Sequence, residues 1–200
     1  MSQRENLYSK PDFWSQKAFK EGYPARSVYK LQEIDKKFGM LKKNSVVLDL
    51  GSAPGSWTTW LLRNIGEKGK VVSVDLNPLS KSVKSENLVF FQGDLLSEEI
   101  RKSVTENGPY DLVVCDAAPL TTGNRIVDTA NSHALVKMAI WYAQTMLHQG
   151  GNFCVKIFQG GNQQKDLQAL REIFTSAKGF KPEACRMTSF ETYLIGLQKK

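Results

Sequence analysis

Short, uninterrupted apolar runs are the feature that most constrains the fold of this 200-residue chain. Strands that are apolar along their length are buried on both faces, which is typical of a largely parallel sheet covered by helices. Segments with apolar residues spaced three and four apart lie between and after these runs, as expected for helices. The predicted strands are Val46–Leu50, Val71–Val74, Leu88–Phe91, Leu112–Cys115 and Phe153–Phe158, and the predicted helices are Trp57–Ile65, Leu135–Met146 and Leu167–Ala177.

This alternation predicts an α/β fold with a Rossmann-like, doubly wound and mostly parallel sheet. Two further β-like runs, Phe180–Met187 and Phe190–Leu197, are joined by Thr188-Ser189 and predict a hairpin. The hairpin places a C-terminal antiparallel strand at the end of the sheet. Because 200 residues suffice for one sizeable core and no repeat or linker interrupts them, we expect residues 1–200 to form a single domain.

The composition argues against several classes of protein. The chain is 41% hydrophobic and 24% charged, as globular proteins are, and no apolar run is long enough to span a membrane. Its N-terminus has no apolar stretch after a basic start, so we expect no secretory signal, no membrane partner and a cytoplasmic location. The three cysteines and two histidines are scattered, which predicts neither a disulfide framework nor a metal site.

The net charge of +7 is concentrated near the N-terminus. Residues 1–44 contain ten Lys and Arg against five Asp and Glu, a net of +5. Basic and aromatic side chains together suit RNA, because guanidinium groups and rings stack on unpaired bases. The alternative is a solvated surface whose rings only pin N-terminal helices to the body. Seven of the twenty aromatic residues lie in this segment: Tyr8, Phe13, Trp14, Phe19, Tyr23, Tyr29 and Phe38.

A glycine-containing turn follows the first predicted strand and opens a helix, with the sequence GSAPGSW from Gly51 to Trp57. Glycines here let the backbone approach a ligand closely, and the helix N-terminus offers free N–H groups. The third glycine of the dinucleotide fingerprint is missing and Pro54 interrupts the loop, which favours a nucleoside ligand without a pyrophosphate. A plain tight turn is the alternative.

Carboxylates follow the ends of three more predicted strands. Asp75 ends the second strand, twenty-four residues after Gly51, where a carboxylate can accept both hydrogen bonds of a ribose diol. Asp94 and Asp116 end the third and fourth strands. Taken singly, each would more often be a helix cap or a turn residue. Ligands of doubly wound sheets bind outside the carboxyl ends of the strands, so their common position indicates a binding edge.

Lys156 interrupts the otherwise apolar run Phe153–Phe158. A lysine rarely enters a core, because its charged form loses hydration there. Desolvation favours the neutral amine, which can act as a general base, so Lys156 is a catalytic candidate. The alternative is a lysine on an edge strand whose amine extends to solvent.

These motifs resemble, in order and along nearly the whole chain, the FtsJ family of ribosomal RNA 2'-O-ribose methyltransferases. The resemblance implies a class I S-adenosylmethionine-dependent methyltransferase fold and methylation of a ribose 2'-hydroxyl, with a uridine of 23S rRNA as the expected target. The matching segments are Ala25–Leu31, DLGSAPGSW at 49–57, Val74–Leu76, Gln92–Asp94, Asp116–Pro119 with Gly123 and Asp128, Val155–Gly160, and Lys181-Pro182 with Arg186 and Glu191–Tyr193.

The resemblance also implies site residues. The family's Lys-Asp-Lys-Glu tetrad matches Lys30, Asp116, Lys156 and Glu191. In this reading Lys156 is the base, and Lys30 is a second cation that disfavours its charged form. Asp116 orients the amine, and Glu191 completes the polar network. The implied contacts with S-adenosylmethionine are Gly51, Gly55, Trp57, Asp75, Asp94 and Asp116, and the implied RNA contacts are Lys17, Lys20, Arg26 and Lys30, within the basic segment 1–44.

Departures from the family pattern are few. Ala117 stands where methionine is common, Cys185 replaces a usual serine, and Tyr23-Pro24-Ala25 replaces an arginine-serine pair. They leave the tetrad intact and bear on the RNA target more than on the chemistry.

The expected partner is therefore rRNA or the 50S subunit, bound by a monomer. One alternative is the same reaction on tRNA or on an mRNA cap. Another is a non-catalytic RNA-binding protein on the same fold, since fold does not dictate function. A third, an NAD-dependent oxidoreductase, is disfavoured by the loop and by the lack of an obvious hydride-transfer residue.

Overall fold

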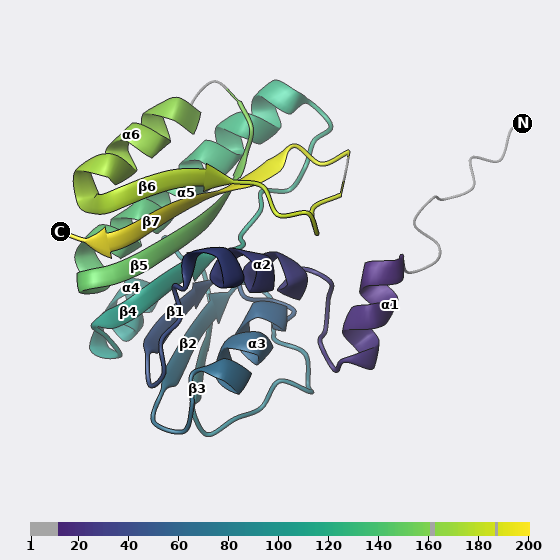
Figure 1. The fold of residues 1–200 in the computed structure, drawn as a ribbon, viewed down its shortest axis with the longest axis vertical. Helices are drawn as coiled ribbons and strands as arrows, with labels where there is room; N and C mark the ends of the chain where they lie inside the picture. The colour runs from purple at the N-terminus through teal and green to yellow at the C-terminus, as the bar shows by residue number, and fades with distance from the viewer. Residues whose placement is uncertain (1–11, 161–162, 187) are drawn as a thin grey trace, which may run out of the picture.

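The computed structural model describes residues 12–160, 163–186 and 188–200. Its centre is a seven-stranded sheet with the order β3-β2-β1-β4-β5-β7-β6 (Figure 1). Adjacent strands from β3 to β5 are parallel, whereas β7 runs antiparallel to β5 and to β6. This sheet confirms the predicted α/β fold with an antiparallel strand near the C-terminus. The strands are β1 (Val46–Leu50), β2 (Lys70–Asp75), β3 (Leu88–Gln92), β4 (Tyr110–Cys115), β5 (Leu147–Phe158), β6 (Phe174–Phe180) and β7 (Glu191–Lys199).

Helices cover both faces of the sheet, as Figure 1 shows. An apolar cluster lies on each face of the sheet. Successive residues of one strand point to opposite faces, so Val47 of β1 belongs to the first cluster, under α2 (Val28–Phe38) and α3 (Ser56–Asn64), and Leu48 belongs to the second, on the other face. The predicted strands are apolar throughout because both of their faces meet helices. The first cluster contains residues of α2 and α3, and the second contains residues of α4 (Glu98–Glu106), α5 (Arg125–Met146) and α6 (Gln163–Ile173).

The first helix, α1 (Phe13–Lys20), lies beside the body rather than over the sheet (Figure 1). Its ring contact with the body joins Trp14 to Tyr29 of α2, with centroids 5.0 Å apart. Phe13 and Phe19 are 72% and 54% exposed. The aromatic residues of the basic segment therefore divide into rings that anchor the helices and rings that face solvent. Tyr8 lies outside the described residues, as do the rest of residues 1–11.

The first strand of the predicted C-terminal hairpin is wrong. The strand that pairs with β7 is β6, Phe174–Phe180, and the described residues from 181 to 190 form a connection without a strand. Met187, where the predicted strand ends, lies outside the described residues. The predicted helix Leu167–Ala177 correspondingly ends at Ile173.

Tertiary packing explains this difference. Phe174 and Ala177 continue a helical spacing of three and four, but the Phe174 ring is buried in a stack with Phe153 of β5, at a centroid distance of 5.9 Å. That contact requires the chain to leave the helix at residue 173. The nonlocal packing outweighs the local helical pattern.

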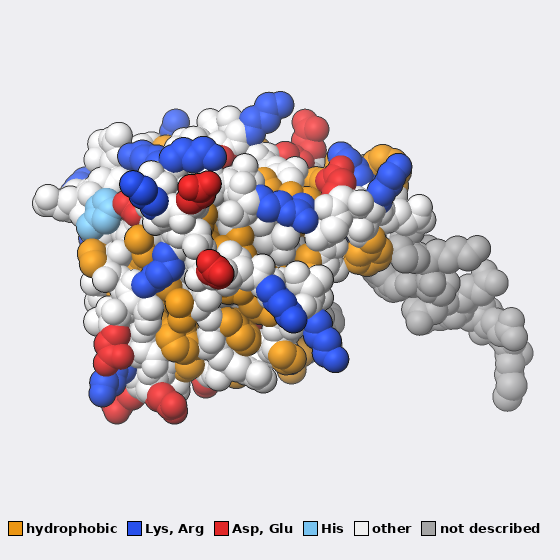
Figure 2. All heavy atoms as spheres, turned by 90° about the horizontal axis from the view of Figure 1, so that it is seen from below, with side chains coloured by type: hydrophobic (Ala, Val, Ile, Leu, Met, Phe, Trp, Pro, Cys, Tyr) orange, Lys and Arg blue, Asp and Glu red, His pale blue; other side chains and the backbone are white. Residues whose placement is uncertain are grey.

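The part of the chain that the structure describes has no membrane-spanning helix, and the positive charge on the face in Figure 2 is dispersed. Among the described residues, no helix has both the length and the apolar character needed to cross a bilayer. On the face drawn in Figure 2, Lys and Arg side chains are scattered among acidic and apolar side chains. The positive charge on this face is therefore dispersed.

We expect Gly196→Ala to lower the free energy of unfolding by about 1–3 kcal/mol, because it overpacks the core. Gly196 lies on β7 between β5 and β6, and a Cβ there would lie 2.4 Å from Cδ2 of the buried Phe174 ring. Urea unfolding measures the loss. Gly179→Ala on β6 is the matched control, since its Cβ would meet nothing closer than 3.6 Å. Equal losses in the two variants would contradict the packing argument.

Candidate active site

The carboxyl ends of β1, β2 and β4 are tied together by backbone hydrogen bonds. The Gly51 N–H after β1 donates to Val74 O of β2 at 2.9 Å, and the Asp116 N–H after β4 donates to Leu50 O of β1 at 3.2 Å. These bonds place the glycine turn, Asp75 and Asp116 along one edge of the sheet, as the sequence predicts.

Lys156 lies on an interior strand and its amine meets Asp116. β5 pairs with β4 on one side and with β7 on the other, and Lys156 is only 8% exposed. Its Nζ lies 3.0 Å from Asp116 Oδ1 and donates to the Asp116 backbone carbonyl at 2.6 Å. The alternative of an edge-strand lysine that reaches solvent is wrong.

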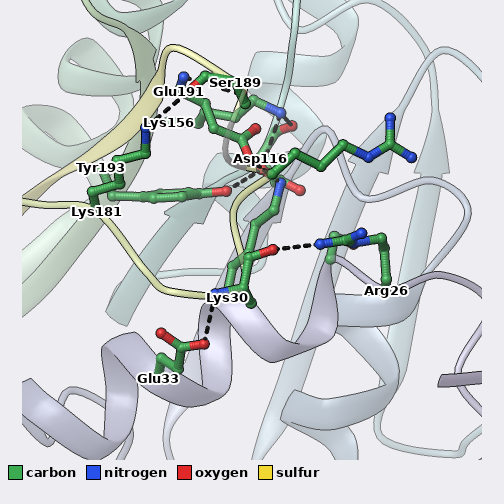
Figure 3. Close-up of polar contacts among 12 residues, drawn as sticks. Arg26, Lys30, Glu33, Asp116, Lys156, Lys181, Ser189, Glu191 and Tyr193 are labelled. Carbon is green, nitrogen blue, oxygen red and sulfur yellow. Dashed lines mark hydrogen bonds and ion pairs between the residues drawn. The ribbon is translucent and has the colours of Figure 1, made fainter. Parts of the chain in front are cut away.

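Asp116 accepts hydrogen bonds from side chains of two neighbouring strands, β5 and β7. Tyr193 of β7 lies directly opposite Lys156 of β5, and its hydroxyl donates to Asp116 Oδ1 at 2.8 Å (Figure 3). Burial raises the pKa of Asp116, but the ammonium groups of Lys156 and Lys30 and the bonds from Lys156 and Tyr193 outweigh it and hold the pKa below its usual value. Asp116 is therefore an ionised carboxylate at neutral pH.

Lys30 and Glu191 form a second ion pair in the same cluster. Lys30 lies in the first turn of α2, and its Nζ is 2.8 Å from Oε1 of Glu191, the first residue of β7. Burial lowers the pKa of Lys30, but the carboxylates of Asp116 and Glu191 outweigh it and raise the pKa above its usual value. The structure thus brings all four residues of the predicted tetrad together as two ion pairs (Figure 3).

The glycine turn requires its two glycines. Gly51 and Gly55 have φ angles of +71° and +107°, in the range that favours glycine. A Cβ on Gly51 would lie 2.6 Å from Cα of Ala117, and one on Gly55 would lie 2.7 Å from Cγ2 of Val83. The turn therefore lies in close contact with the chain just after Asp116 and with Val83.

Three buried polar atoms around this turn have no hydrogen-bond partner among the described residues: Asp49 Oδ1, Ser52 Oγ and Ser56 Oγ. Buried polar atoms are rarely left without a partner, so these atoms suit a polar ligand. The other Asp49 oxygen accepts from the Thr58 hydroxyl at 2.6 Å. Complete burial raises the pKa of Asp49 to about 7.

Asp75 and Asp94 lie near the adjacent strand ends, as predicted. Asp75 Oδ2 accepts from the Ala53 N–H at 2.9 Å, so this carboxylate also holds the glycine turn. Asp94 is exposed just beyond β3, and its Oδ1 accepts from the Leu96 N–H at 2.9 Å. Gln92 links the two strand ends by donating to Leu76 O at 3.0 Å.

Trp57 is placed differently from its neighbours in the turn. Its ring is 2% exposed and packs against Tyr193, with centroids 5.8 Å apart. The indole N–H donates to Ser27 O at 2.9 Å, which ties α3 to the start of α2. The side chain therefore supports the fold beneath the site.

The predicted RNA-binding residues separate into two groups. Arg26 and Lys30 line a cavity of about 400 Å³ that also includes Glu191. Lys17 and Lys20 are exposed on α1 and do not line this cavity. Lys17 lies 3.9 Å from a Glu21 oxygen and 4.8 Å from the centroid of the Tyr29 ring, so it also contributes to packing around α1.

Sequence reasoning missed two residues of the site, Asp49 and Tyr193. A charged residue within an apolar run singles out Lys156, and the same signal was available for Asp49 in Val46–Leu50. Tyr193 gave no such signal, since an aromatic residue in a strand is ordinary. Only the β5–β7 register places its hydroxyl at Asp116.

The sequence profile of the FtsJ-like methyltransferases matches residues 23–199. This chain belongs to the FtsJ-like methyltransferase family. Curated relatives are similar over almost the full chain. A Treponema denticola protein named ribosomal RNA large subunit methyltransferase E is 61% identical over 196 residues, covering 98% of both chains. A protein of the same name from Oleidesulfovibrio alaskensis is 44% identical over 188 residues, covering 93% of this chain and 90% of its own.

Solved methyltransferase structures share the fold of this chain. A crystal structure of a Plasmodium falciparum protein assigned as a ribosomal RNA methyltransferase has a TM-score of 0.76 and 28% identity, covering 88% of this chain and 98% of its own. The methyltransferase MycE of the mycinamycin biosynthetic pathway, in complex with Mg and SAH, has a TM-score of 0.57 and 15% identity, covering 95% of this chain and 49% of its own. The latter likeness shows the fold alone.

The pKa of Asp49 predicts a pH-dependent effect of Asp49→Asn on stability. Above pH 4 the unfolded chain ionises this carboxyl while the fold keeps it protonated up to about pH 7, so the wild type loses stability as pH rises. Asparagine removes that loss and keeps an acceptor for Thr58. We expect the free energy of unfolding of the variant, relative to that of the wild type, to rise by up to about 4 kcal/mol by pH 7 and then to stay constant.

Chemical unfolding of both proteins at several pH values between 5 and 8 measures the part of this gain that arises above pH 5, about 2–3 kcal/mol. Asp128→Asn is the control, because bonds from Thr122 hold the pKa of Asp128 below its usual value. Its effect on stability should be constant in this range. A pH-independent difference for Asp49→Asn would contradict the raised pKa.

Proposed function

We propose that the protein transfers a methyl group from S-adenosylmethionine to a ribose 2'-hydroxyl of large-subunit ribosomal RNA. The observation that carries the proposal is the Lys156 amine, buried against the Asp116 carboxylate at the edge where the glycine turn lies. The names of the relatives, ribosomal RNA large subunit methyltransferase E, support the substrate class. We also propose that the protein acts in the cytoplasm, where ribosomal RNA is made and assembled in bacteria.

The residues around the glycine turn fit the cofactor. Gly51 and Gly55 let the turn pack closely against Ala117 and Val83, and the buried hydroxyls of Ser52 and Ser56 have no hydrogen-bond partner among the described residues. The first turn of α3 adds backbone N–H groups, which we propose as the contribution of Trp57. Asp75 is proposed to bind the ribose diol of the cofactor and Asp94 to lie near its adenine. Asp116 would lie beside its methionine portion.

S-adenosylmethionine supplies, when bound, a methyl group already activated by its positively charged sulfur. The protein must then align the ribose oxygen and remove its proton. We assign proton removal to Lys156, which must release the proton of the ammonium that is paired with Asp116 before it can act as the base. The ammonium that results is stabilised by the Asp116 carboxylate and carbonyl, which already accept from Nζ.

Lys30 and Glu191 contribute to the same step through charge. Lys30 stays protonated because Asp116 and Glu191 raise its pKa. We propose that Lys30 supplies a fixed positive charge beside Asp116, whose carboxylate it shares with Lys156. Glu191 holds Lys30 in place and so acts as a positioning residue.

Lys156→Ala is expected to lower methyl transfer by about 10²–10⁴-fold, the usual contribution of a general base, while cofactor affinity stays within about three-fold. Lys156→Arg should be as inactive, because arginine keeps the charge but cannot become a neutral base at ordinary pH. Labelled cofactor is incubated with unmethylated 50S subunits, naked rRNA or tRNA, and the labelled nucleotide is mapped. Calorimetry measures cofactor binding in parallel.

Lys165→Ala, on α6, is the matched control and should retain turnover. Near-normal turnover in Lys156→Ala would end the assignment of the base. Label in tRNA but not in rRNA would identify tRNA as the substrate instead. Failure of the wild type to bind S-adenosylmethionine would favour the non-catalytic RNA-binding protein.

The N-terminal segment is proposed to bind the RNA backbone. We expect Arg26→Ala and the double variant Lys17→Ala/Lys20→Ala to weaken RNA binding and to reduce the slope of log affinity against log salt. Each lost phosphate contact should reduce the slope by about 0.7, the value for single strands. Filter binding of rRNA at several KCl concentrations measures both quantities. Unchanged affinity and slope in a variant would remove its residues from the interface.

A further inference from the structure

We propose that Arg26 and Arg186 form a binding site for one phosphate of the RNA substrate, which the Asp12 carboxylate occupies in the free protein. The inference rests on the proposed function, from which it takes RNA as the ligand. It adds Arg186 to the RNA interface and gives Asp12 a role as an intramolecular competitor.

The two guanidinium groups converge on one carboxylate oxygen. Nη1 of Arg26 is ion-paired with Oδ2 of Asp12, and its Nη2 donates to Ala184 O at 2.7 Å. Nη2 of Arg186 lies 3.8 Å from the same Asp12 oxygen. Arg26 comes from the segment before α2 and Arg186 from the connection before β7, so the fold brings them together. Guanidinium groups around an anionic oxygen are the usual recognition of a phosphate.

The arginine pair lies beside two residues of the tetrad. Arg26 and Arg186 line the same cavity of about 400 Å³ as Lys30 and Glu191. In RNA the 2'-hydroxyl and the 3'-phosphate are carried by adjacent carbons of one sugar. A ribose that enters this cavity with its 2'-hydroxyl toward the tetrad therefore carries a phosphate close by, and the arginine pair offers the charge to bind it.

The Asp12 carboxylate can be exchanged without unfolding α1. Its side chain is 37% exposed and that of Arg186 is 51% exposed, and ion pairs open to solvent contribute little to stability. Oδ1 of Asp12 accepts from the Ser15 N–H at 2.8 Å and caps α1 independently of the arginines. Arg26 is only 15% exposed, and its bond to Ala184 O keeps it in place when the carboxylate leaves.

The decisive variant is Asp12→Asn, which keeps the helix cap and removes the charge. Glu21→Gln is the matched control, because it removes one negative charge from the same segment but pairs with Lys17 and Tyr29 rather than with the arginines. The readouts are kcat and KM for methyl transfer to unmethylated 50S subunits at several KCl concentrations. Each variant is also made in the Arg26→Ala background.

We expect Asp12→Asn to lower KM about three- to five-fold, as loss of a weak competing ion pair implies, and to steepen its salt dependence. Glu21→Gln should change KM by less than about two-fold. In the Arg26→Ala background the effect of Asp12→Asn on KM should be smaller, because only Arg186, 3.8 Å from the carboxylate, is then left to be released. Arg186→Ala should raise KM without the same loss of kcat as Lys156→Ala.

Equal effects of Asp12→Asn and Glu21→Gln would overturn the proposal, because general charge would then account for both. An undiminished effect of Asp12→Asn in the Arg26→Ala background would also overturn it. In either case, methylation of the subunits by the wild type would leave the proposed function standing. Absence of methylation by the wild type on any RNA would instead refute the proposed function and this inference with it.

Discussion

The ionised Asp116 carboxylate is the interaction on which the rest of the site depends. It follows β4 and accepts from Lys156 of β5 and Tyr193 of β7, so it connects the parallel strands with the antiparallel C-terminal strand. An unpaired buried carboxylate would be strongly unfavourable, and the nearby cations of Lys156 and Lys30 remove that penalty. The same contacts that stabilise the charge also fix the amine that we assign as the base.

The glycine turn shows a second coupling between stability and function. Its backbone lies against Ala117, and Asp75 and the backbone of β2 hold it through hydrogen bonds. Beneath it, Asp49 and two serine hydroxyls have buried atoms without a hydrogen-bond partner in the part of the chain that the structure describes. Such groups lower the stability of the free protein, and a polar ligand that bonds to them recovers the loss. These groups are one reason why we propose that the cofactor binds at this turn.

The N-terminal basic segment combines structural and proposed binding roles. Lys17 packs near Tyr29, and Arg26 is held by Asp12 and Ala184 O, so part of its positive charge is already neutralised inside the protein. A net charge counted from the sequence therefore overstates what is available to RNA. The proposed exchange of the Asp12 carboxylate for a phosphate would release part of that charge only when substrate arrives.

The sequence alone determined the class of fold and most of the strand-end edge at which we propose that the cofactor binds, because those properties follow from short-range patterns. Continuous apolar runs indicate strands covered on both faces, and a lysine within such a run indicates a candidate functional residue, whatever the position of the strand in the sheet. The order of motifs was enough to find the tetrad by resemblance. The tertiary structure decided which groups meet: the pairing of Lys30 with Glu191, the hydroxyl of Tyr193 at Asp116, and Arg186 beside Arg26. It also ended α6 at Ile173, where burial of Phe174 against Phe153 outweighs a helical pattern that continues in the sequence. These contacts join residues far apart in the chain, and no local pattern encodes them.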